Sequence, residues 1–385
     1  MSQAEAPTTR RAIVRGADPV VLAGELAHQL DAPNAAAVVF FASPNLDRDA
    51  FAAALRGAFG DTVVLGCTTA GEIGPEGLSD GSVTAFSLPR GAFHAACAPI
   101  PDLTHFTLNG GAGIVGDLKR ALASQGVLPS ADHTFAMLLV DGLSVREELL
   151  ASSLYVALGE IPLFGGSAGD GLRFEGTHVY AGGAFASDAA ALLLVHTELP
   201  FRVFKTQHIT GTDQKLVVTG ADEAQRTVTE IDGEPAAEAY ARLVGKEVAA
   251  LTPEVFAANP VVVRLGGQQF VRSIQKANGD GSLTFYCAIE DGIVLSLAHP
   301  GDLHDMLSSE FAAIEAQIGP PQLIIGCDCI LRRLEVERLG ERDRVGELFV
   351  KHHVVGFSTY GEQINGMHVN QTFTGVAIGS LPKAA

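Results

Sequence analysis

The sequence predicts an α/β (α+β) protein with two related lobes, in which mixed, largely antiparallel β-sheets carry helices on their outer faces. Three observations predict this class. Strand-like and amphipathic helical patterns alternate over the first part of the chain. Short β-branched runs separated by turn signals fill the region 201–297, which favours antiparallel strands. The pattern Gly-x-(Ser/Thr)-Thr-x-Gly-Glu occurs twice, from Gly66 and from Gly356, each time after a β-branched run.

Composition and charge exclude several classes of protein. The chain has 385 residues, of which 47% are hydrophobic and 18% charged, so it is long enough for two globular domains. A net charge of −18 argues against nucleic acid or an anionic membrane surface as a partner. No run approaches the ~18 apolar residues of a membrane span, and the N-terminus lacks the apolar core of a signal peptide. Five cysteines, an odd number with irregular spacing, fit reduced thiols, so we expect a cytoplasmic protein.

We expect a disordered tail over residues 1–9, an N-terminal domain over 10–199 and a C-terminal domain over 200–385. The N-terminal domain begins with a short strand, followed by a helix that Asp18 caps and Pro19 starts. The Gly-rich segment after the third strand is expected to be a loop at the rim of a site. The elements expected next are strands at 36–42, 62–66, 82–88, 93–100, 134–141, 179–185 and 190–196, and helices at 47–59, 113–124 and 146–158; the Gly-rich loop is expected at 67–81.

The C-terminal domain is expected to combine a meander of short strands with three helices. A buried strand is expected at 323–329, and a single charged amphipathic helix at 331–350. The other elements expected here are strands at 201–209, 216–219, 227–231, 261–265, 270–276, 283–289 and 293–297, and helices at 235–244 and 303–317.

The last part of the chain, 354–379, begins and ends as a buried strand and has a polar middle. Asn365-Gly366 between two strand-like runs predicts a β-hairpin, because a type I′ turn needs a positive φ at both central residues. This turn sets the register, in which Gln363 faces His368. One face then carries Thr359, Gln363, His368, Asn370 and Thr372, with a gap left by Gly361, and the other carries Tyr360 and Glu362.

The polar face of this hairpin has two interpretations: the wall of a ligand pocket, or a solvated face of an edge hairpin. The apolar ends of the hairpin favour the pocket wall. His368 is then the best single metal-ligand candidate, since a neutral imidazole can bind a haem iron from one side. The alternative is a core histidine whose nitrogens are satisfied by Gln363 or a backbone carbonyl.

Other catalytic and cofactor signatures are weak. The twelve histidines show no metalloprotease or zinc-finger spacing, and there is no P-loop or dinucleotide fingerprint. The segment 165–169 matches the G-x-S-x-G nucleophile elbow around Ser167. That motif needs a helix directly after the serine, whereas turn and strand residues follow here, so a serine hydrolase is a distant alternative. The glycines instead favour close backbone approach.

Several stretches resemble the FIST family of bacterial sensory proteins, whose members have an N-terminal and a C-terminal FIST half. The matching stretches are LGCTTAGEI near residue 65, FGGSAGDGLRF and THVYAGG within 164–183, IDGEPAAEAY at 231–240, IIGCDCILRR at 324–333, and VVGFSTYGEQINGMHVNQTFTGVAIG at the end. The final stretch looks most like the subgroup of nitric-oxide-sensing haem proteins called NosP. The resemblance implies a cytoplasmic sensor that binds haem b, responds to nitric oxide and regulates a histidine kinase or a cyclic-di-GMP enzyme.

The wider family resemblance implies an alternative, a haem-free sensor of a small metabolite such as an amino acid. Both interpretations, the haem sensor and the haem-free sensor, imply a protein that is not an enzyme. A homodimer is one assembly we consider. The repeated motif and the hairpin place the expected site near the interface of the two lobes. The residues expected there are His368 as iron ligand, with Gln363, Asn370, Thr372, Thr359, Tyr360, Gly361, Thr68, Thr69, Glu72 and Ser167 around the cofactor.

Overall fold

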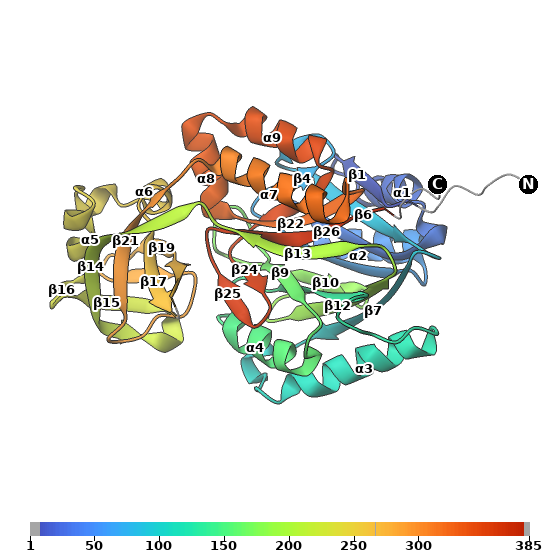
Figure 1. The fold of residues 1–385 in the computed structure, drawn as a ribbon, viewed down its shortest axis with the longest axis horizontal. Coiled ribbons are helices and arrows are strands. Elements are labelled where there is room, and N and C mark those ends of the chain that lie inside the picture. The colour runs from blue at the N-terminus through green and yellow to red at the C-terminus, as the bar shows by residue number, and fades with distance from the viewer. Residues whose placement is uncertain (1–7, 266, 381–385) are drawn as a thin grey trace, which may run out of the picture.

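The computed structural model describes residues 8–265 and 267–380 and consists of two lobes of unequal size (Figure 1). The large lobe carries both ends of the chain, and the small lobe, residues 209–300, projects from it on the left of Figure 1. Mixed, largely antiparallel sheets with helices outside them confirm the predicted α+β class. Of the tail expected over residues 1–9, only Thr8 and Thr9 lie within the described residues, and the backbone N–H of Thr9 donates to Gln322.

The large lobe repeats one order of elements three times. The first repeat is β1 (Arg10–Val14), α1 (Pro19–Gln29), β2 (Ala35–Ala42), α2 (Arg48–Phe59), β3 (Val63–Thr68), β4 (Glu72–Gly74), β5 (Gly77–Ser79) and β6 (Val83–Pro89). The second repeat is β7 (Phe93–Ile100), α3 (Gly110–Ser124), β8 (Thr134–Val140), α4 (Glu147–Leu158), β9 (Leu163–Ser167), β10 (Val179–Ala181), β11 (Ala184–Ala186) and β12 (Ala190–Thr197).

The third repeat contains the small lobe as an insertion after its first strand. It consists of β13 (Phe201–Thr206), then the insertion, then α7 (Leu303–Ile318), β22 (Leu323–Cys329), α8 (Ile330–Leu339), α9 (Arg342–Lys351), β23 (Val354–Thr359), β24 (Glu362–Ile364), β25 (Met367–Val369) and β26 (Phe373–Ile378). The two copies of the Gly-x-(Ser/Thr)-Thr-x-Gly-Glu pattern therefore occupy equivalent positions, at the ends of β3 and β23, and both lie in the large lobe.

Each repeat builds four strands of its own sheet and gives its hairpin to the sheet of another repeat. The first sheet has the order β1-β6-β2-β3 and is extended by the β10–β11 hairpin of the second repeat. The second sheet, β7-β12-β8-β9, receives β24–β25 of the third repeat, and the third sheet, β13-β26-β22-β23, receives β4–β5 of the first. The exchange links the three sheets in a closed ring.

The three sheets share one apolar core and carry helices on their outer faces. Side chains from all three meet in the centre, where the rings of Phe41 and Phe357 stack with centroids 4.7 Å apart. Helices α1 and α2 cover the first sheet, α3 and α4 the second, and α7 and α9 the third. Because both faces of these sheets are covered, strands such as β2 read as continuous hydrophobic runs.

The small lobe has its own sheet and core. Its sheet has the order β18-β17-β21-β14-β15-β20-β19, with β16 paired to β15, and two short helices pack on it. Its elements are β14 (Ile209–Asp222), β15 (Thr227–Ile231), β16 (Glu234–Pro235), α5 (Ala236–Leu243), α6 (Pro253–Ala258), β17 (Val261–Leu265), β18 (Gln268–Arg272), β19 (Ile274–Ala277), β20 (Leu283–Phe285) and β21 (Val294–Pro300). The division of the chain at residues 199 and 200 stays a prediction about domain organisation.

Several sequence predictions about single elements were wrong. The single strand expected at 179–185 is the β10–β11 hairpin. The helix expected over 331–350 is interrupted, because Gly340 adopts a φ of 68° and ends α8 before α9 begins. The segment expected to be a loop at 67–81 is the β4–β5 hairpin, which pairs with β23 of the third repeat. Periodicity predicts none of these features. The break at Gly340 is a local glycine stop, whereas the β4–β5 hairpin depends on β23, far away in the sequence.

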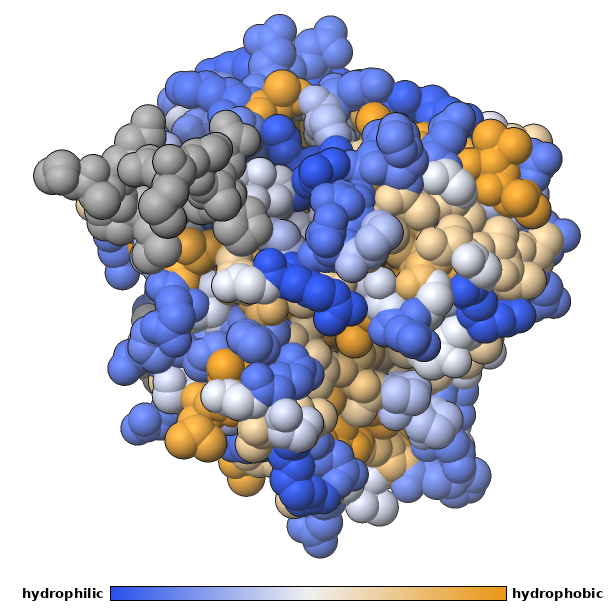
Figure 2. Space-filling view, turned by 90° about the vertical axis from the view of Figure 1, so that its right-hand side faces the viewer, coloured by the Kyte–Doolittle hydropathy of each residue, from blue (hydrophilic) through white to orange (hydrophobic). Residues whose placement is uncertain are grey.

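Figure 2 shows the side of the molecule that is on the right in Figure 1. The surface there is mostly hydrophilic, with an apolar strip across it. No helix within residues 8–265 and 267–380 is long and apolar enough to cross a membrane.

Because β22 and β23 approach each other closely, a methyl group added at Gly356 should strongly lower the stability of the protein. A Cβ at Gly356 would lie 1.8 Å from the carbonyl oxygen of Gly326, so Gly356→Ala should lower the free energy of unfolding by at least about 1–3 kcal/mol. Denaturant unfolding followed by circular dichroism measures this. The matched control is Gly24→Ala in α1, where no atom lies within 4 Å and alanine should stabilise the helix by about 0.5–1 kcal/mol. Equal stabilities of the two variants would contradict the close approach.

Candidate functional site

The β24–β25 hairpin has the register predicted from its turn. Gln363 pairs with His368 and Ile364 with Met367, and Asn365 at the tip has a φ of 52°. On its other side β24 pairs with β9. β25 is the edge strand of this sheet, but His368 is only 5% exposed because the small lobe covers it.

Both ring nitrogens of His368 have hydrogen-bond partners. Nδ1 lies 3.1 Å from Nε2 of Gln363, and Nε2 lies 3.3 Å from the carbonyl oxygen of Tyr286 in the small lobe. The Gln363 amide also donates to Oγ of Ser167 at 3.0 Å. An amide nitrogen can only donate, so this network assigns Nδ1 as acceptor and Nε2–H as donor. The structure therefore shows the arrangement named as the alternative to iron ligation.

In this arrangement His368 does not fit a haem iron. Iron needs an unprotonated ring nitrogen with room for the macrocycle in front of it. The Tyr286 carbonyl lies in front of Nε2, and the ring packs so closely on Gly361 that a Cβ there would lie 2.2 Å from Cε1. The gap predicted at Gly361 is thus filled by the imidazole itself.

Thr359, Tyr360 and Asn370 hold the backbone around this histidine. Oγ1 of Thr359 lies 2.7 Å from the carbonyl of Ser167, and the Tyr360 hydroxyl donates to the carboxylate of Asp170. Nδ2 of Asn370 lies 3.5 Å from the Tyr360 carbonyl. Ser167 is fully buried at the end of β9 and is followed by a loop, so the helix that a nucleophile elbow requires is absent from the segment described here.

Two of the three exchanged hairpins have a buried glutamate at their base. These are β4–β5 of the first repeat and β24–β25 of the third. Oε2 of Glu362 accepts hydrogen bonds from the backbone N–H and the hydroxyl of Thr372, at 3.1 and 2.7 Å. Glu72 has the same relation to Ser82, at 3.0 and 2.8 Å, and accepts a further bond from Thr69. In both hairpins the partner lies ten residues after the glutamate, so Thr69, Glu72 and Thr372 have a structural role.

The position of Thr372 corrects the face assignment made from alternation. Thr372 contacts Glu362, not the face that carries His368. The alternation fails because Gln371 has a φ of 52°, which interrupts the strand between β25 and β26.

Three strand-end loops meet around the base of the hairpins and are joined by backbone hydrogen bonds. Ala70 N–H donates to the Ser358 carbonyl at 3.0 Å, and Ser167 N–H donates to the Gly361 carbonyl at 2.8 Å. Gly169 N–H donates to the Thr68 carbonyl at 3.0 Å. The hydroxyl of Thr68 also accepts from the backbone N–H of His178 at 3.0 Å. The loops of all three repeats are therefore fixed to one another.

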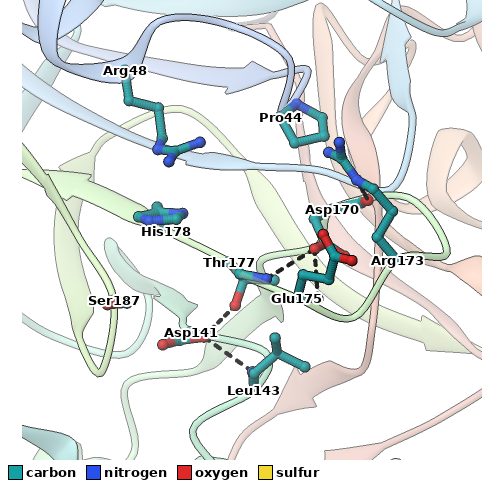
Figure 3. Close-up of a pocket in the computed structure, with 11 residues that line it drawn as sticks. Pro44, Arg48, Asp141, Leu143, Asp170, Arg173, Glu175, Thr177, His178 and Ser187 are labelled. Carbon is teal, nitrogen blue, oxygen red and sulfur yellow. Dashed lines mark hydrogen bonds between the residues drawn. The ribbon is translucent and has the colours of Figure 1, made fainter.

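An open pocket that the sequence analysis missed lies beside these loops (Figure 3). Its volume is about 490 Å³. It is lined by Pro44, Arg48, Asp141, Leu143, Asp170, Arg173, Glu175, Gly176, Thr177, His178 and Ser187. Pro44 lies two residues after β2, and Asp141 directly follows β8. The pocket is therefore at the carboxyl ends of strands, where α/β proteins bind ligands. This position is the signal that could have revealed it.

The two buried acids of the pocket are already occupied by protein donors. Asp141 accepts from Leu143 N–H and Asp188 N–H and from the Thr177 hydroxyl. Asp170 accepts from three backbone N–H groups and from the Tyr360 hydroxyl.

Burial would raise the pKa of Asp170, but the hydrogen bonds from Tyr360 and from three backbone N–H groups hold this pKa below its usual value. The carboxylate is therefore ionised near neutral pH and fixes the loop above it.

The basic groups of the pocket remain available for a ligand. Arg48 and Arg173 point into the space from two sides in Figure 3, with His178 below Arg48. No described residue forms an ion pair or hydrogen bond with the guanidinium of Arg48. Burial, and then the charge of Arg48, lower the pKa of His178. Glu175 is exposed at the rim.

The loop 170–178 connects this pocket to the small lobe. One side of it lines the pocket, and on the other side the ring of Phe174 lies 4.9 Å from that of Tyr360 and 5.9 Å from that of Tyr286, centroid to centroid. Phe174 has a φ of 55°, which is strained for an aromatic residue, and its N–H is held by Asp170 at 2.9 Å.

A buried ion pair is the second link between the lobes. Arg226 of the small lobe donates to Glu147 at 2.6 Å and also to Glu148, both in the first turn of α4. The same guanidinium donates to the Tyr286 carbonyl at 2.7 Å. Tyr286, already in contact with His368 and Phe174, is therefore the residue of the small lobe on which these contacts converge.

The FIST N domain matches residues 36–234, and the FIST C domain matches residues 236–365. The chain therefore belongs to the FIST family, whose domains are associated with sensing in signal transduction and not with catalysis. No curated protein matched the chain. The boundary between the two matched domains falls inside the small lobe, between β16 and α5.

The buried carboxyl of Glu362 predicts a pH-dependent effect of Glu362→Gln. Burial raises the pKa of Glu362 well above the usual 4.5, so the folded protein keeps a proton that the unfolded chain releases. The free energy of unfolding of the unmodified protein should therefore fall as pH rises from 4.5 through the folded-state pKa. Glutamine cannot titrate, so the variant should gain relative stability between pH 5 and pH 8, by about 1.4 kcal/mol for each unit of pKa shift within that window.

Denaturant unfolding at the two pH values measures this difference. Glu347→Gln, at an exposed position of α9, controls for the substitution itself. The raised pKa of Glu362 would be contradicted if the Glu362→Gln variant and the unmodified protein differed in stability by the same amount at both pH values.

Proposed function

We propose that this chain is a haem-free sensor of a small metabolite that carries both a carboxylate and an ammonium group, such as an amino acid. The metabolite binds in the pocket of Figure 3, and binding changes the position of the small lobe. The observation that carries this proposal is that loop 170–178 is both a wall of the pocket and a contact surface of the small lobe.

The chemistry of the pocket supports such a ligand. Arg48 and Arg173 offer N–H groups to a carboxylate, since Arg173 uses only Nε and Nη1 for Asp170 and Asn45. Glu175 at the rim can accept an ammonium group, because its carboxylate is exposed and makes no ion pair with a described residue. A ligand of opposite charges at its two ends is thus favoured over a simple anion or cation.

The contacts between the lobes support transmission of the binding signal. A ligand held by Arg173 and Glu175 constrains the backbone on either side of Phe174, whose strained φ gives the loop a second conformation at small cost. Several buried polar atoms near the interface have no hydrogen-bond partner among the described residues: Tyr286 Oη, Ser358 Oγ, Gln363 Oε1 and Asn370 Oδ1. Such atoms can form hydrogen bonds with water when the lobes separate, which favours a contact that can open.

A partner protein reads the lobe position in this proposal. The resemblance to sensory proteins supports a histidine kinase or a cyclic-di-GMP enzyme as that partner. A difference of about 1–3 kcal/mol between the two lobe positions suffices for switching.

A haem-based sensor of nitric oxide is the second candidate. The likeness of the C-terminal stretch to nitric-oxide-sensing haem proteins favours it, whereas the contacts of His368 oppose ligation at that residue. Bound haem would supply the iron that coordinates nitric oxide. The next histidines to test are His178, His196 and His299; His178 and His196 line cavities of about 490 and 280 Å³.

Ligand binding tests the first candidate. A panel of amino acids screened by thermal shift should contain a ligand that raises the melting temperature of the protein. Arg48→Ala should weaken its binding by at least about tenfold, because a charge-assisted hydrogen bond is lost. Arg120→Ala, on the surface of α3, should leave the affinity unchanged. Equal affinities of all three proteins would place the ligand elsewhere.

Phe174→Ala should separate binding from transmission. We expect ligand affinity within about threefold of the unmodified protein, because the ring points away from the pocket towards Tyr286. Hydrogen exchange of residues 282–290 should slow on ligand binding in the unmodified protein and stay constant in the variant. A response of the same size in both proteins would contradict transmission through this loop.

An absorption spectrum separates the two candidates. The protein purified from haem-supplemented cells should show no Soret band if the first proposal holds. A Soret band that shifts on nitric oxide would support the second candidate, and its loss in His368→Ala would identify that residue as the iron ligand.

A further inference from the structure

We propose a transition-metal site at the end of the second sheet opposite to the pocket, formed by three histidines and one glutamate: His94, His133, His196 and Glu198. The site does not depend on the proposed sensor function. His133 precedes β8 and Asp141 follows it, so the length of that strand separates the cluster from the pocket of Figure 3.

Strand pairing brings the histidines together although they are far apart in the sequence. His94 in β7 and His196 in β12 are direct cross-strand partners, so their side chains share one face. Thr134 is the partner of His196 on the other side, in β8, and His133 immediately precedes it. Sequence spacing alone therefore shows no metal motif, in agreement with the sequence analysis.

His196 lies between the other two rings, because β12 is the strand between β7 and β8, and each neighbouring ring is close to it. The centroid of the His196 ring lies 6.2 Å from that of His94 and 5.9 Å from that of His133. The carboxylate of Glu198 lies between two imidazoles, with Oε1 at 3.4 Å from Nε2 of His196 and Oε2 at 3.3 Å from Nδ1 of His133. As the side chains stand, no three of these ligand atoms lie within 4.8 Å of one another. Metal–ligand bonds are about 2.0–2.2 Å long, so the side chains must rotate to bind the ion.

The burial of the four side chains allows such a movement. The His196 side chain is 7% exposed and fixed, while those of His133 and Glu198 are 43% and 73% exposed and free to rotate. Nδ1 of His196 lies 3.2 Å from Oγ1 of Thr134, which orients the ring and leaves Nε2 for the ion. Metal-binding histidines commonly have such a partner on their second nitrogen.

A cavity gives the ion access to this cluster. His94, His196 and Glu198 line a cavity of about 280 Å³ that also includes Val127 and Leu199. Thr8 and Ser380, the first and last of the described residues, belong to its lining as well.

Imidazole and carboxylate ligands without sulfur favour zinc, nickel or copper over magnesium and calcium, which take oxygen ligands. We assign the site to a divalent ion of this class and use Zn²⁺ as the probe.

The test is titration of the full-length, tag-free, chelator-treated protein with Zn²⁺ by calorimetry, with Co²⁺ absorption as a second readout of tetrahedral coordination. We expect one ion per chain and at least tenfold weaker binding in His196→Ala and in His133→Ala. Thr134→Val should weaken binding by about 10–100-fold, as expected for a residue that orients a ligand. Because His133 is exposed, its variant should fold even if His196→Ala does not.

His304→Ala is the matched control, because Asp302, His304 and Asp305 form an exposed group that could also bind an ion. This variant should bind Zn²⁺ as the unmodified protein does. No stoichiometric binding by the unmodified protein would overturn the proposal. Loss of binding in His304→Ala with full binding in His133→Ala would overturn it as well, and would place the ion at the other group.

Discussion

The exchange of hairpins between the three sheets is the constraint on which the large lobe depends. Each sheet is completed by strands from another repeat, so a sheet cannot reach its full width until two repeats have folded. The same exchange brings the strand-end loops of all three repeats to one place, where backbone hydrogen bonds join Ala70, Ser167 and Gly169 to neighbouring repeats. The glutamates at the hairpin bases are buried because they hold these junctions, and desolvation raises the pKa of both.

The proposed function depends on the place where the small lobe meets that junction. The small lobe contributes Tyr286, which contacts the hairpin through its carbonyl and loop 170–178 through its ring. The loop is held by the four donors to Asp170, which is why a residue as bulky as Phe174 keeps a positive φ. In the proposed function, this strained segment between the open pocket and the small lobe is the physical basis for coupling the two.

The sequence predicted the fold class, most strands and helices of the large lobe and the register of the final hairpin, because these follow from local periodicity and from the Asn365-Gly366 turn. It did not predict that the β7–β12 unit is a further copy of the same order of elements, because the loop after β9 lacks the Gly-x-(Ser/Thr)-Thr-x-Gly-Glu pattern. His368 was identified as a special residue, yet its partner in the small lobe, the Tyr286 carbonyl, has no sequence signal. The pocket residues were missed because they become neighbours only when the first and second sheets assemble.

The insertion point of the small lobe has a consequence for how such proteins can diversify. The chain leaves the large lobe after β13 and re-enters it before α7, and the two crossings lie side by side, with Gly301 N–H donating to the His208 carbonyl at 2.6 Å. A module whose two ends are adjacent can be lengthened, replaced or removed without altering the path of the ring around it. In the proposed function, receptor and output can therefore vary independently in evolution, one in the strand-end loops and the other in the inserted module.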